Sequence, residues 1–172
     1  MHTTFTRFLS PLGELVLTAS ETALTGVRFP TSRHVPPLHG AESPRAAERR
    51  GAGGEVLARA CQQLTEYFVR TRTTFDLPLD PTGTPFELRV WEELRAIPFG
   101  ATRSYAEIAR RLGDVRLTRA VGAANGKNPI PIIVPCHRVI GAKGDLTGFG
   151  GGLDRKRWLL EHEGALLSLG RV

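Results

Sequence analysis

The stretch from residue 128 to residue 140 constrains this chain more than any other. Its sequence, NPIPIIVPCHRVI, places three prolines around an apolar run. Proline fixes its own φ, lacks an amide hydrogen and restricts the residue before it, so a regular helix is excluded here. We expect a rigid, extended segment that presents Cys136, the residue after the third proline, at a defined point of the fold.

The residues that follow Cys136 can support a reactive thiol. A thiolate is favoured by nearby positive charge and by a base that takes the thiol proton. Arg138 supplies the charge, and His137 is a candidate base. The competing interpretation is a buried, inert thiol beside a structural histidine.

A histidine that acts as a base needs a group to hold its second ring nitrogen. Glu163, at the end of a final predicted helix from Asp154 to Glu163, is the candidate, and Glu161 and His162 are nearby competitors. A negative charge at a helix C-terminus is mildly unfavourable, which indicates a partner for Glu163. The alternative is a solvated helix end.

The charge of the chain indicates the class of its partner, and its apolar stretches and cysteines indicate its compartment. The chain has 23 Lys and Arg against 17 Asp and Glu, a formal charge of +6, and its isoelectric point is near 10.1. Such a basic chain favours a polyanionic partner such as nucleic acid. No stretch approaches the ~18 apolar residues that cross a bilayer. We therefore expect a cytoplasmic protein without a membrane partner, in which Cys61 and Cys136 are free thiols.

The first 83 residues indicate a small antiparallel sheet with one helix. The predicted elements are strands at Thr3–Leu9, Glu14–Ala19 and Leu24–Phe29, an amphipathic helix at Glu55–Val69 and a short edge strand at Phe75–Leu79. Helical spacing places Cys61 on the buried face as part of the core. Residues 30–54 are dense in Pro, Gly and Arg, and we expect a partly mobile surface loop there without an assigned function.

From residue 84 onward the pattern changes to helices. The sequences TPFE at 84–87 and SYAE at 104–107 are capping boxes, and each begins a helix. The second of these helices ends at Gly113, and a third helical segment runs from Arg116 to Asn125. Two short helices joined by a tight turn predict either a helix-turn-helix, whose second helix enters a DNA groove, or plain helical packing. The whole pattern is that of an α+β protein with domains at 1–83 and 84–172.

The motif Pro135-Cys136-His137-Arg138-Val139 resembles the active-site motif of the O6-methylguanine-DNA methyltransferases. The resemblance continues in order over nearly all of the second domain, at Phe86, Arg103–Ala109, Arg119–Gly122, Asn128-Pro129, Gly151–Leu153 and Leu159–Gly164. The first domain matches loosely, as a short sheet with a helix, for which the family implies an RNase H-like topology.

This resemblance implies a DNA repair reaction. Cys136 would attack the alkyl carbon on guanine O6, and His137 would take the thiol proton through a water while Glu163 orients the imidazole. Asn128 would bridge the active-site segment to the end of the recognition helix and fix the turn. The thioether product offers water no electrophilic carbonyl, so one protein would repair one lesion without a cofactor.

The resemblance also implies how DNA is bound. The expected DNA- and substrate-binding residues are Ser104, Tyr105, Arg119, Arg138, Val139, Gly150 and Lys156. Arg119 would fill the space left when the target nucleotide is extruded from duplex DNA. The recognition helix would use the minor groove, where readout is degenerate. We expect a monomer, with cooperative assembly on DNA and activity on O4-alkylthymine left open.

Two features depart from many relatives. Phe149-Gly150 stands where they have a tyrosine followed by serine or arginine, so a phenolic hydroxyl and a side-chain contact to the substrate oxygen are missing. The first domain has no Cys and His set spaced for zinc, and no metal is expected.

The competing functions are a binding protein for alkylated DNA that performs no transfer, a transcription regulator and a cysteine hydrolase; Cys136 argues against the first.

Overall fold

The structure is a computed structural model that describes residues 3–29 and 52–168. The chain divides into two compact units, Met1–Thr82 and Gly83–Val172, which are described separately. The sequence places this division one residue later, after Gly83. Most of the predicted loop 30–54 lies outside the described residues, and its last three residues are helical.

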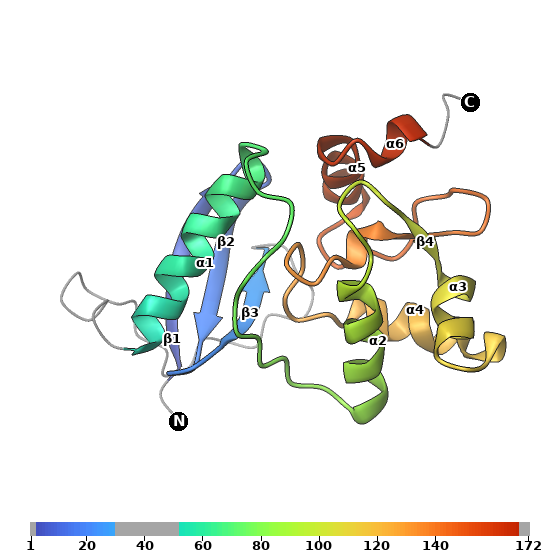
Figure 1. Cartoon of the computed structure of the whole chain (residues 1–172), viewed down its shortest axis with the longest axis horizontal. Coiled ribbons are helices and arrows are strands. Elements are labelled where there is room, and N and C mark those ends of the chain that lie inside the picture. Colours follow the sequence, from blue (N-terminus) through green and yellow to red (C-terminus); the bar gives the residue numbers. More distant parts are fainter. Residues whose placement is uncertain (1–2, 30–51, 169–172) are drawn as a thin grey trace. The chain divides into compact units, whose positions relative to one another are not determined.

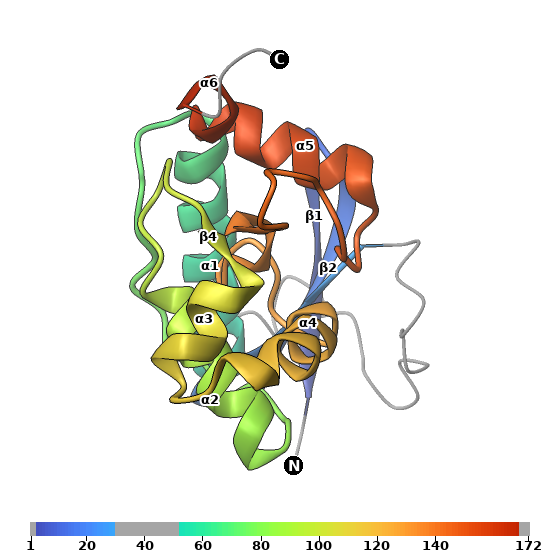
Figure 2. The same ribbon diagram turned by 90° about the vertical axis from the view of Figure 1, so that its right-hand side faces the viewer.

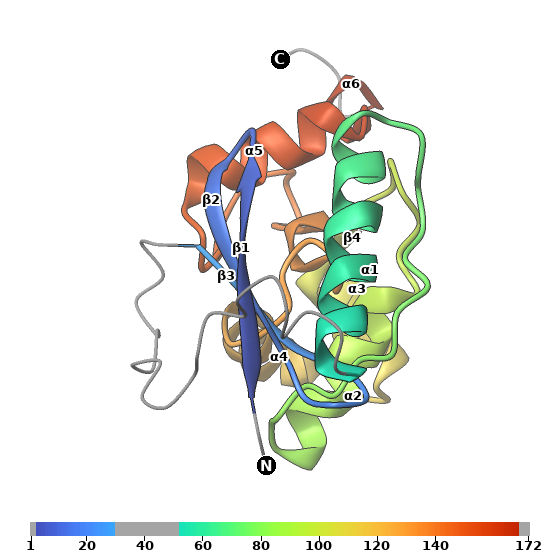
Figure 3. The same ribbon diagram turned by 90° about the vertical axis from the view of Figure 1, so that its left-hand side faces the viewer.

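The first unit is a three-stranded antiparallel sheet with one helix (Figure 1). Its strands are β1 (Thr4–Ser10), β2 (Gly13–Ala19) and β3 (Leu24–Arg28), in the order β1-β2-β3. Alternate residues of β2 are fully buried at Leu15, Leu17 and Ala19, as expected for a strand with one face on the core. Helix α1 (Ala52–Phe68) packs along this sheet, as Figure 3 shows from the side.

Two predictions for this unit need correction. Cys61 is partly exposed on α1 rather than buried. The expected strand at Phe75–Leu79 is reduced to a single bridge between Leu24 and Leu79. The reason is a contact with α1, because the Gln63 side chain donates to the Asp76 carbonyl at 2.9 Å and accepts from the Asp76 amide at 2.9 Å. These backbone groups are thereby satisfied without a neighbouring strand.

The second unit is mostly helical (Figure 2). Its elements are α2 (Pro85–Arg95), β4 (Arg103–Ser104), α3 (Tyr105–Arg111), η2 (Val115–Leu117), α4 (Thr118–Gly126), η3 (Cys136–Arg138), β5 (Val139–Ile140), α5 (Leu153–His162) and α6 (Ala165–Ser168). Both predicted capping boxes are present, at Thr84 before α2 and at Ser104 before α3. Gly113, with φ of +107°, follows the end of α3, where glycine tolerates a conformation that costs other residues energy.

Helices α3 and α4 form the predicted helix-turn-helix and pack on each other and on α2. The turn between them contains the 3-10 helix η2, so the predicted third helical segment begins as a 3-10 turn before α4. Trp91 of α2 is buried beneath α4, where its indole nitrogen donates to the Ala124 carbonyl at 2.9 Å. Helix α4, the second helix of this motif, is thus anchored from inside the unit.

A short parallel pairing of β4 with β5 joins the start of α3 to the end of η3. It places the cysteine segment beside the helix-turn-helix. Within residues 3–29 and 52–168, no helix is both long and apolar enough to span a membrane.

Candidate active site

The segment that leads to Cys136 folds back on itself, so the expectation of an extended segment is wrong. The Val134 amide donates to the Ile130 carbonyl at 2.9 Å. Ile132 at the tip has φ of +76°, a strained conformation for a β-branched residue. Asn128 closes the turn, because its amide group donates to the Val134 carbonyl at 2.7 Å and its oxygen accepts from the Ile130 amide at 3.0 Å. The predicted rigidity therefore comes from a closed turn around Asn128.

Cys136 begins η3 and is 3% exposed. Burial raises the pKa of its thiol to about 11, while a hydrogen bond from Asn128 and the charge of Lys156 act in the opposite direction. At neutral pH the resting thiol is therefore protonated.

His137 is fully buried and faces the predicted carboxylate. Its Nε2 lies 2.8 Å from Oε1 of Glu163, so we place the ring proton on Nε2. Nδ1 of His137 is buried and has no hydrogen-bond partner in the described part of the chain. Burial lowers the pKa of His137 despite the opposing effect of Glu163, and the charges of Arg138 and Lys156 lower it further. The imidazole is thus neutral and has an available lone pair on Nδ1.

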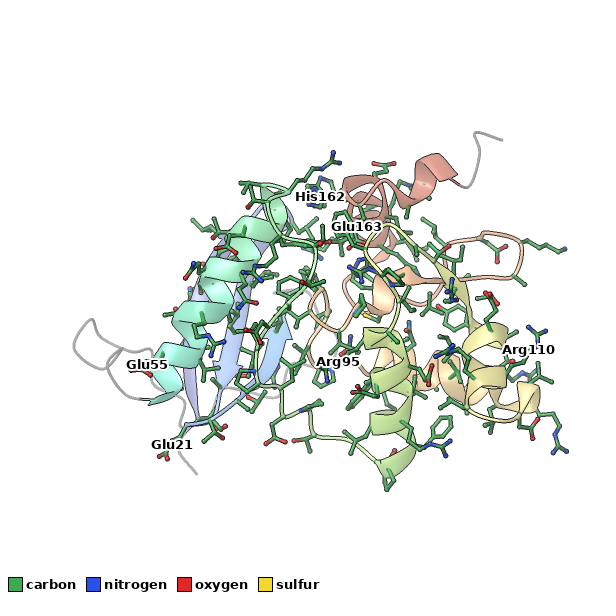
Figure 4. All side chains as sticks on the ribbon, viewed as in Figure 1. Glu21, Glu55, Arg95, Arg110, His162 and Glu163 are labelled. Atoms are coloured by element: carbon green, nitrogen blue, oxygen red, sulfur yellow. The ribbon has the colours of Figure 1, made fainter. Side chains whose placement is uncertain are left out.

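Glu163 caps the C-terminus of α5 and is held by several donors. Besides His137, Arg138 donates to it through Nε at 2.8 Å and through Nη2 at 2.9 Å. The Gly100 amide donates to Oε2 at 3.3 Å. Burial alone would raise the pKa of Glu163, but hydrogen bonds and charges from His137 and Arg138 hold it well below its usual range. Figure 4 shows Glu163 beside His162 at the end of α5.

Arg138 does not fit the role of a DNA contact. Its side chain is 7% exposed, and its third nitrogen, Nη1, donates to the Ile97 carbonyl at 2.6 Å. The guanidinium also lies 5.9 Å from the centre of the Phe99 ring. Because the guanidinium is directed inward to Glu163, it is unavailable to a phosphate.

Lys156 and Tyr105 meet at the carbonyl of Thr147. Lys156 is fully buried, and its Nζ donates to the carbonyls of Val139 at 2.5 Å and Thr147 at 2.6 Å. The Tyr105 hydroxyl donates to the Thr147 carbonyl at 2.8 Å. Burial lowers the pKa of Lys156 to about 8, opposed by Cys136, and burial raises the pKa of Tyr105. The structure thus brings these two predicted residues together with Val139.

Sequence reasoning missed Asn125, which joins α4 to the cysteine segment. It is 2% exposed, and its amide group donates to the carbonyls of Cys136 and Gly148, each at 3.4 Å. A signal was present in the sequence. Asn125 lies four residues after the buried Val121, which places a polar side chain on the apolar face of a short helix.

Three predicted residues remain, Arg119, Ser104 and Gly150. Arg119 is exposed on α4 and makes no ion pair within the described ranges. Ser104 caps α3, since its hydroxyl accepts from the Glu107 amide at 3.1 Å. Gly150 is exposed, and a Cβ there would lie 3.5 Å from the Gly126 carbonyl, an ordinary contact.

A helix-turn-helix packed beside a buried cysteine centre is the arrangement of an enzyme that acts on DNA.

Comparison with known proteins agrees with that class. Residues 85–165 match the DNA-binding domain of 6-O-methylguanine DNA methyltransferase, and residues 3–81 match its ribonuclease-like domain. A methylated-DNA–protein-cysteine methyltransferase of Mycolicibacterium paratuberculosis is 49% identical, over 90% of this chain and 88% of its own length. One from Methanosarcina acetivorans is 43% identical, over 92% of this chain and 96% of its own length.

A solved structure of the Mycobacterium tuberculosis protein OGT in complex with DNA superposes with a TM-score of 0.84 at 44% identity, covering 98% of this chain and 99% of that one. This chain belongs to the 6-O-methylguanine DNA methyltransferase family. The expected ribonuclease-like first domain and DNA-binding second domain are confirmed.

Proposed function

We propose that this chain repairs alkylated DNA by moving the alkyl group from O6 of guanine in duplex DNA to the sulfur of Cys136, in a single turnover. Membership of the family, with relatives named methylated-DNA–protein-cysteine methyltransferase over most of the chain, supports methyl transfer to a protein cysteine. The observation that carries the assignment to Cys136 is the buried thiol at the start of η3, whose next residue, His137, is paired with Glu163.

The proposed reaction is a displacement at the alkyl carbon. A bond forms between the Cys136 sulfur and that carbon, and the bond from the carbon to guanine O6 breaks. The thiol proton passes to Nδ1 of His137, directly or through a water, and the leaving guanine is finally protonated. Because burial holds the thiol pKa at about 11, proton removal accompanies substrate binding or attack rather than preceding it.

Single turnover is expected from the product. A thioether has no electrophilic carbonyl through which water could release the group, in contrast to the acyl-enzyme of a hydrolase. The His137–Glu163 pair resembles that of a hydrolase, but it serves one proton transfer.

Extrusion of the target nucleotide follows from the burial of Cys136. A thiol that is 3% exposed cannot reach an oxygen inside a base-paired stack, so the nucleotide must leave the stack at a cost of about a few kcal/mol. We assign Arg119, which is exposed on the recognition helix, to the space left in the duplex. Tyr105 and Lys156 would support the guanine as charge builds on it.

We also propose that the protein acts in the cytoplasm. Its chemistry requires Cys136 as a free thiol, and a reducing compartment keeps thiols free.

The test is a mass measurement after incubation with excess duplex carrying one O6-methylguanine. We expect one added methyl group on the peptide that contains Cys136 and an equal amount of restored guanine. Cys136→Ser should bind the duplex without an adduct, and the control Cys61→Ser should behave as wild type. Repeated turnover would support a hydrolase, and binding without any adduct would support a binding protein or regulator.

A further inference from the structure

Arg138 and Glu163 form an ion pair that is withdrawn from solvent on both sides. Their side chains are 7% and 0% exposed, and two parallel hydrogen bonds of 2.8 and 2.9 Å join them. The third guanidinium nitrogen is bound to the Ile97 carbonyl at 2.6 Å. Burying such a pair costs desolvation that its attraction barely offsets, so stability alone is a poor explanation for it.

The pair shares its carboxylate with His137. Oε1 of Glu163 accepts from both His137 Nε2 at 2.8 Å and Arg138 Nη2 at 2.9 Å. A carboxylate that faced the imidazole alone would favour a protonated ring. A protonated His137 could not accept the thiol proton.

We propose that Arg138 is a positioning residue that fixes Glu163 and compensates its negative charge, so that His137 stays neutral with its Nδ1 lone pair available as the proton acceptor. The guanidinium suits this role because it remains charged at every relevant pH and its planar fork fixes both carboxylate oxygens. This inference rests on the proposed function, in which His137 takes the proton from Cys136.

Other charges also act on His137. Glu163 favours its protonated form, whereas Arg138 and Lys156 disfavour it, and burial acts in the same direction as these two cations. Lys156 is bound to the carbonyls of Val139 and Thr147, not to Glu163. Replacing Arg138 by an uncharged residue therefore removes the positive charge beside the Glu163 carboxylate, while Lys156 stays in place.

The experiment compares Arg138→Met, Arg138→Lys and the matched control Arg111→Met, which removes an arginine that pairs with Glu93 on the surface. His137 is titrated by NMR in the DNA-free protein, with His137→Gln used to assign its resonance. The rate constant of methyl transfer to each protein is measured as a function of pH in single-turnover reactions. Circular dichroism and thermal melts establish that each variant is folded.

In the wild type, burial should hold the His137 midpoint below that of an ordinary histidine, because its pKa is lowered. In Arg138→Met we expect this midpoint to rise by about one pH unit or more, and the acidic limb of the rate profile to move upward by the same amount. Arg138→Lys keeps the charge but loses the fork, so its midpoint should stay near the wild-type value while the maximal rate falls. Arg111→Met should change neither.

An unchanged or lower midpoint in folded Arg138→Met would overturn the proposal. If that variant does not fold, Arg138→Lys decides: a midpoint raised by a unit despite the retained charge would overturn it, and an unchanged midpoint with a lower maximal rate would support it. Absence of methyl transfer in the wild type would instead overturn the proposed function, and the NMR titration would still report on Arg138.

Discussion

At Cys136, burial and neighbouring charge act on the thiol in opposite directions. Burial is the larger effect and raises the pKa to about 11, although Lys156 favours the thiolate. A thiol exposed to water would lack this effect of burial, and its pKa would be lower. Under the proposed function, the nucleophile is therefore protonated in the DNA-free protein at neutral pH.

This predicts a steep pH dependence for chemical alkylation of Cys136 in the DNA-free protein. With a pKa of about 11, the thiolate fraction at pH 7 is on the order of one in ten thousand, and it rises about tenfold per pH unit up to pH 10. Iodoacetamide labelling followed by peptide mass analysis measures the rate at each pH. Cys61, partly exposed on α1, is the internal reference. Equal rates at the two cysteines at pH 7 would contradict this account.

Gly100 is a second residue with a specific demand. Its φ is +77°, and a Cβ there would lie 3.0 Å from the Glu163 carbonyl oxygen. Gly144 has φ of +84°, but no heavy atom lies within 4 Å of a Cβ built there. Substitutions at the two glycines therefore distinguish the effect of backbone strain from that of close packing against Glu163.

We expect Gly144→Ala to lower the free energy of unfolding by about 1 kcal/mol through backbone strain alone. Gly100→Ala should lower it by about 1 kcal/mol more, because the methyl group presses on the helix end that carries Glu163. Urea denaturation of the two variants measures the difference. Equal losses of unfolding free energy would show that the contact with Glu163 does not destabilise the Gly100→Ala variant.

At the scale of elements, α4 combines a buried attachment with an exposed charge. Asn125 and the Trp91–Ala124 hydrogen bond fix the helix from within. Arg119 lies on the exposed side of α4. On the preceding helix, α3, Arg110 also extends outward (Figure 4). A rigid helix that displays arginine is suited to entering a groove of DNA.

Arg119→Ala should therefore slow methyl transfer from duplex DNA strongly while leaving the reaction with free O6-benzylguanine nearly unchanged. The reason is that only the duplex has a stack to be filled when a nucleotide is extruded. Single-turnover rates on both substrates provide the measurement, with Arg111→Ala as the control on the adjoining helix. Equal losses on the two substrates would remove Arg119 from this role.

Elements with local signals were predictable from the sequence. Both capping boxes, the glycine stop after α3 and the three strands depend on residues a few positions apart, and they occur near the predicted positions. The pairing of His137 with Glu163 was also predicted, because a charge at a helix end lacked a local partner.

Features that depend on side chains meeting across the fold were not predictable. Proline spacing limits φ near Cys136 but does not reveal that Asn128 closes residues 130–134 into a turn. Arg138 lies two residues after Cys136 in the chain, yet its guanidinium reaches Glu163. Gln63 similarly replaces a strand at Asp76. In each case, a polar side chain satisfies a backbone group or a charge that the local sequence pattern does not assign to it.

For the whole molecule, the net charge of +6 favours contacts with DNA phosphates, and the number of these contacts sets how binding responds to salt. Phosphate contacts release counterions, so affinity for duplex DNA should fall steeply, by about one to several orders of magnitude between 50 and 200 mM salt. Fluorescence anisotropy with Cys136→Ser, which cannot be consumed, measures this slope. An affinity independent of salt would contradict the electrostatic account of DNA binding.

The indole of Trp91 gives the protein an optical reporter of its own. Trp91 is 2% exposed and bound to the carbonyl of Ala124 in the recognition helix, whereas the other tryptophan, Trp158, stacks on His162 with ring centres 4.8 Å apart on α5. Emission from an indole depends on its hydrogen bond and its local polarity. In a Trp158→Phe background, a spectral shift on adding DNA would therefore follow movement of the recognition helix in real time, without a dye attached to either partner.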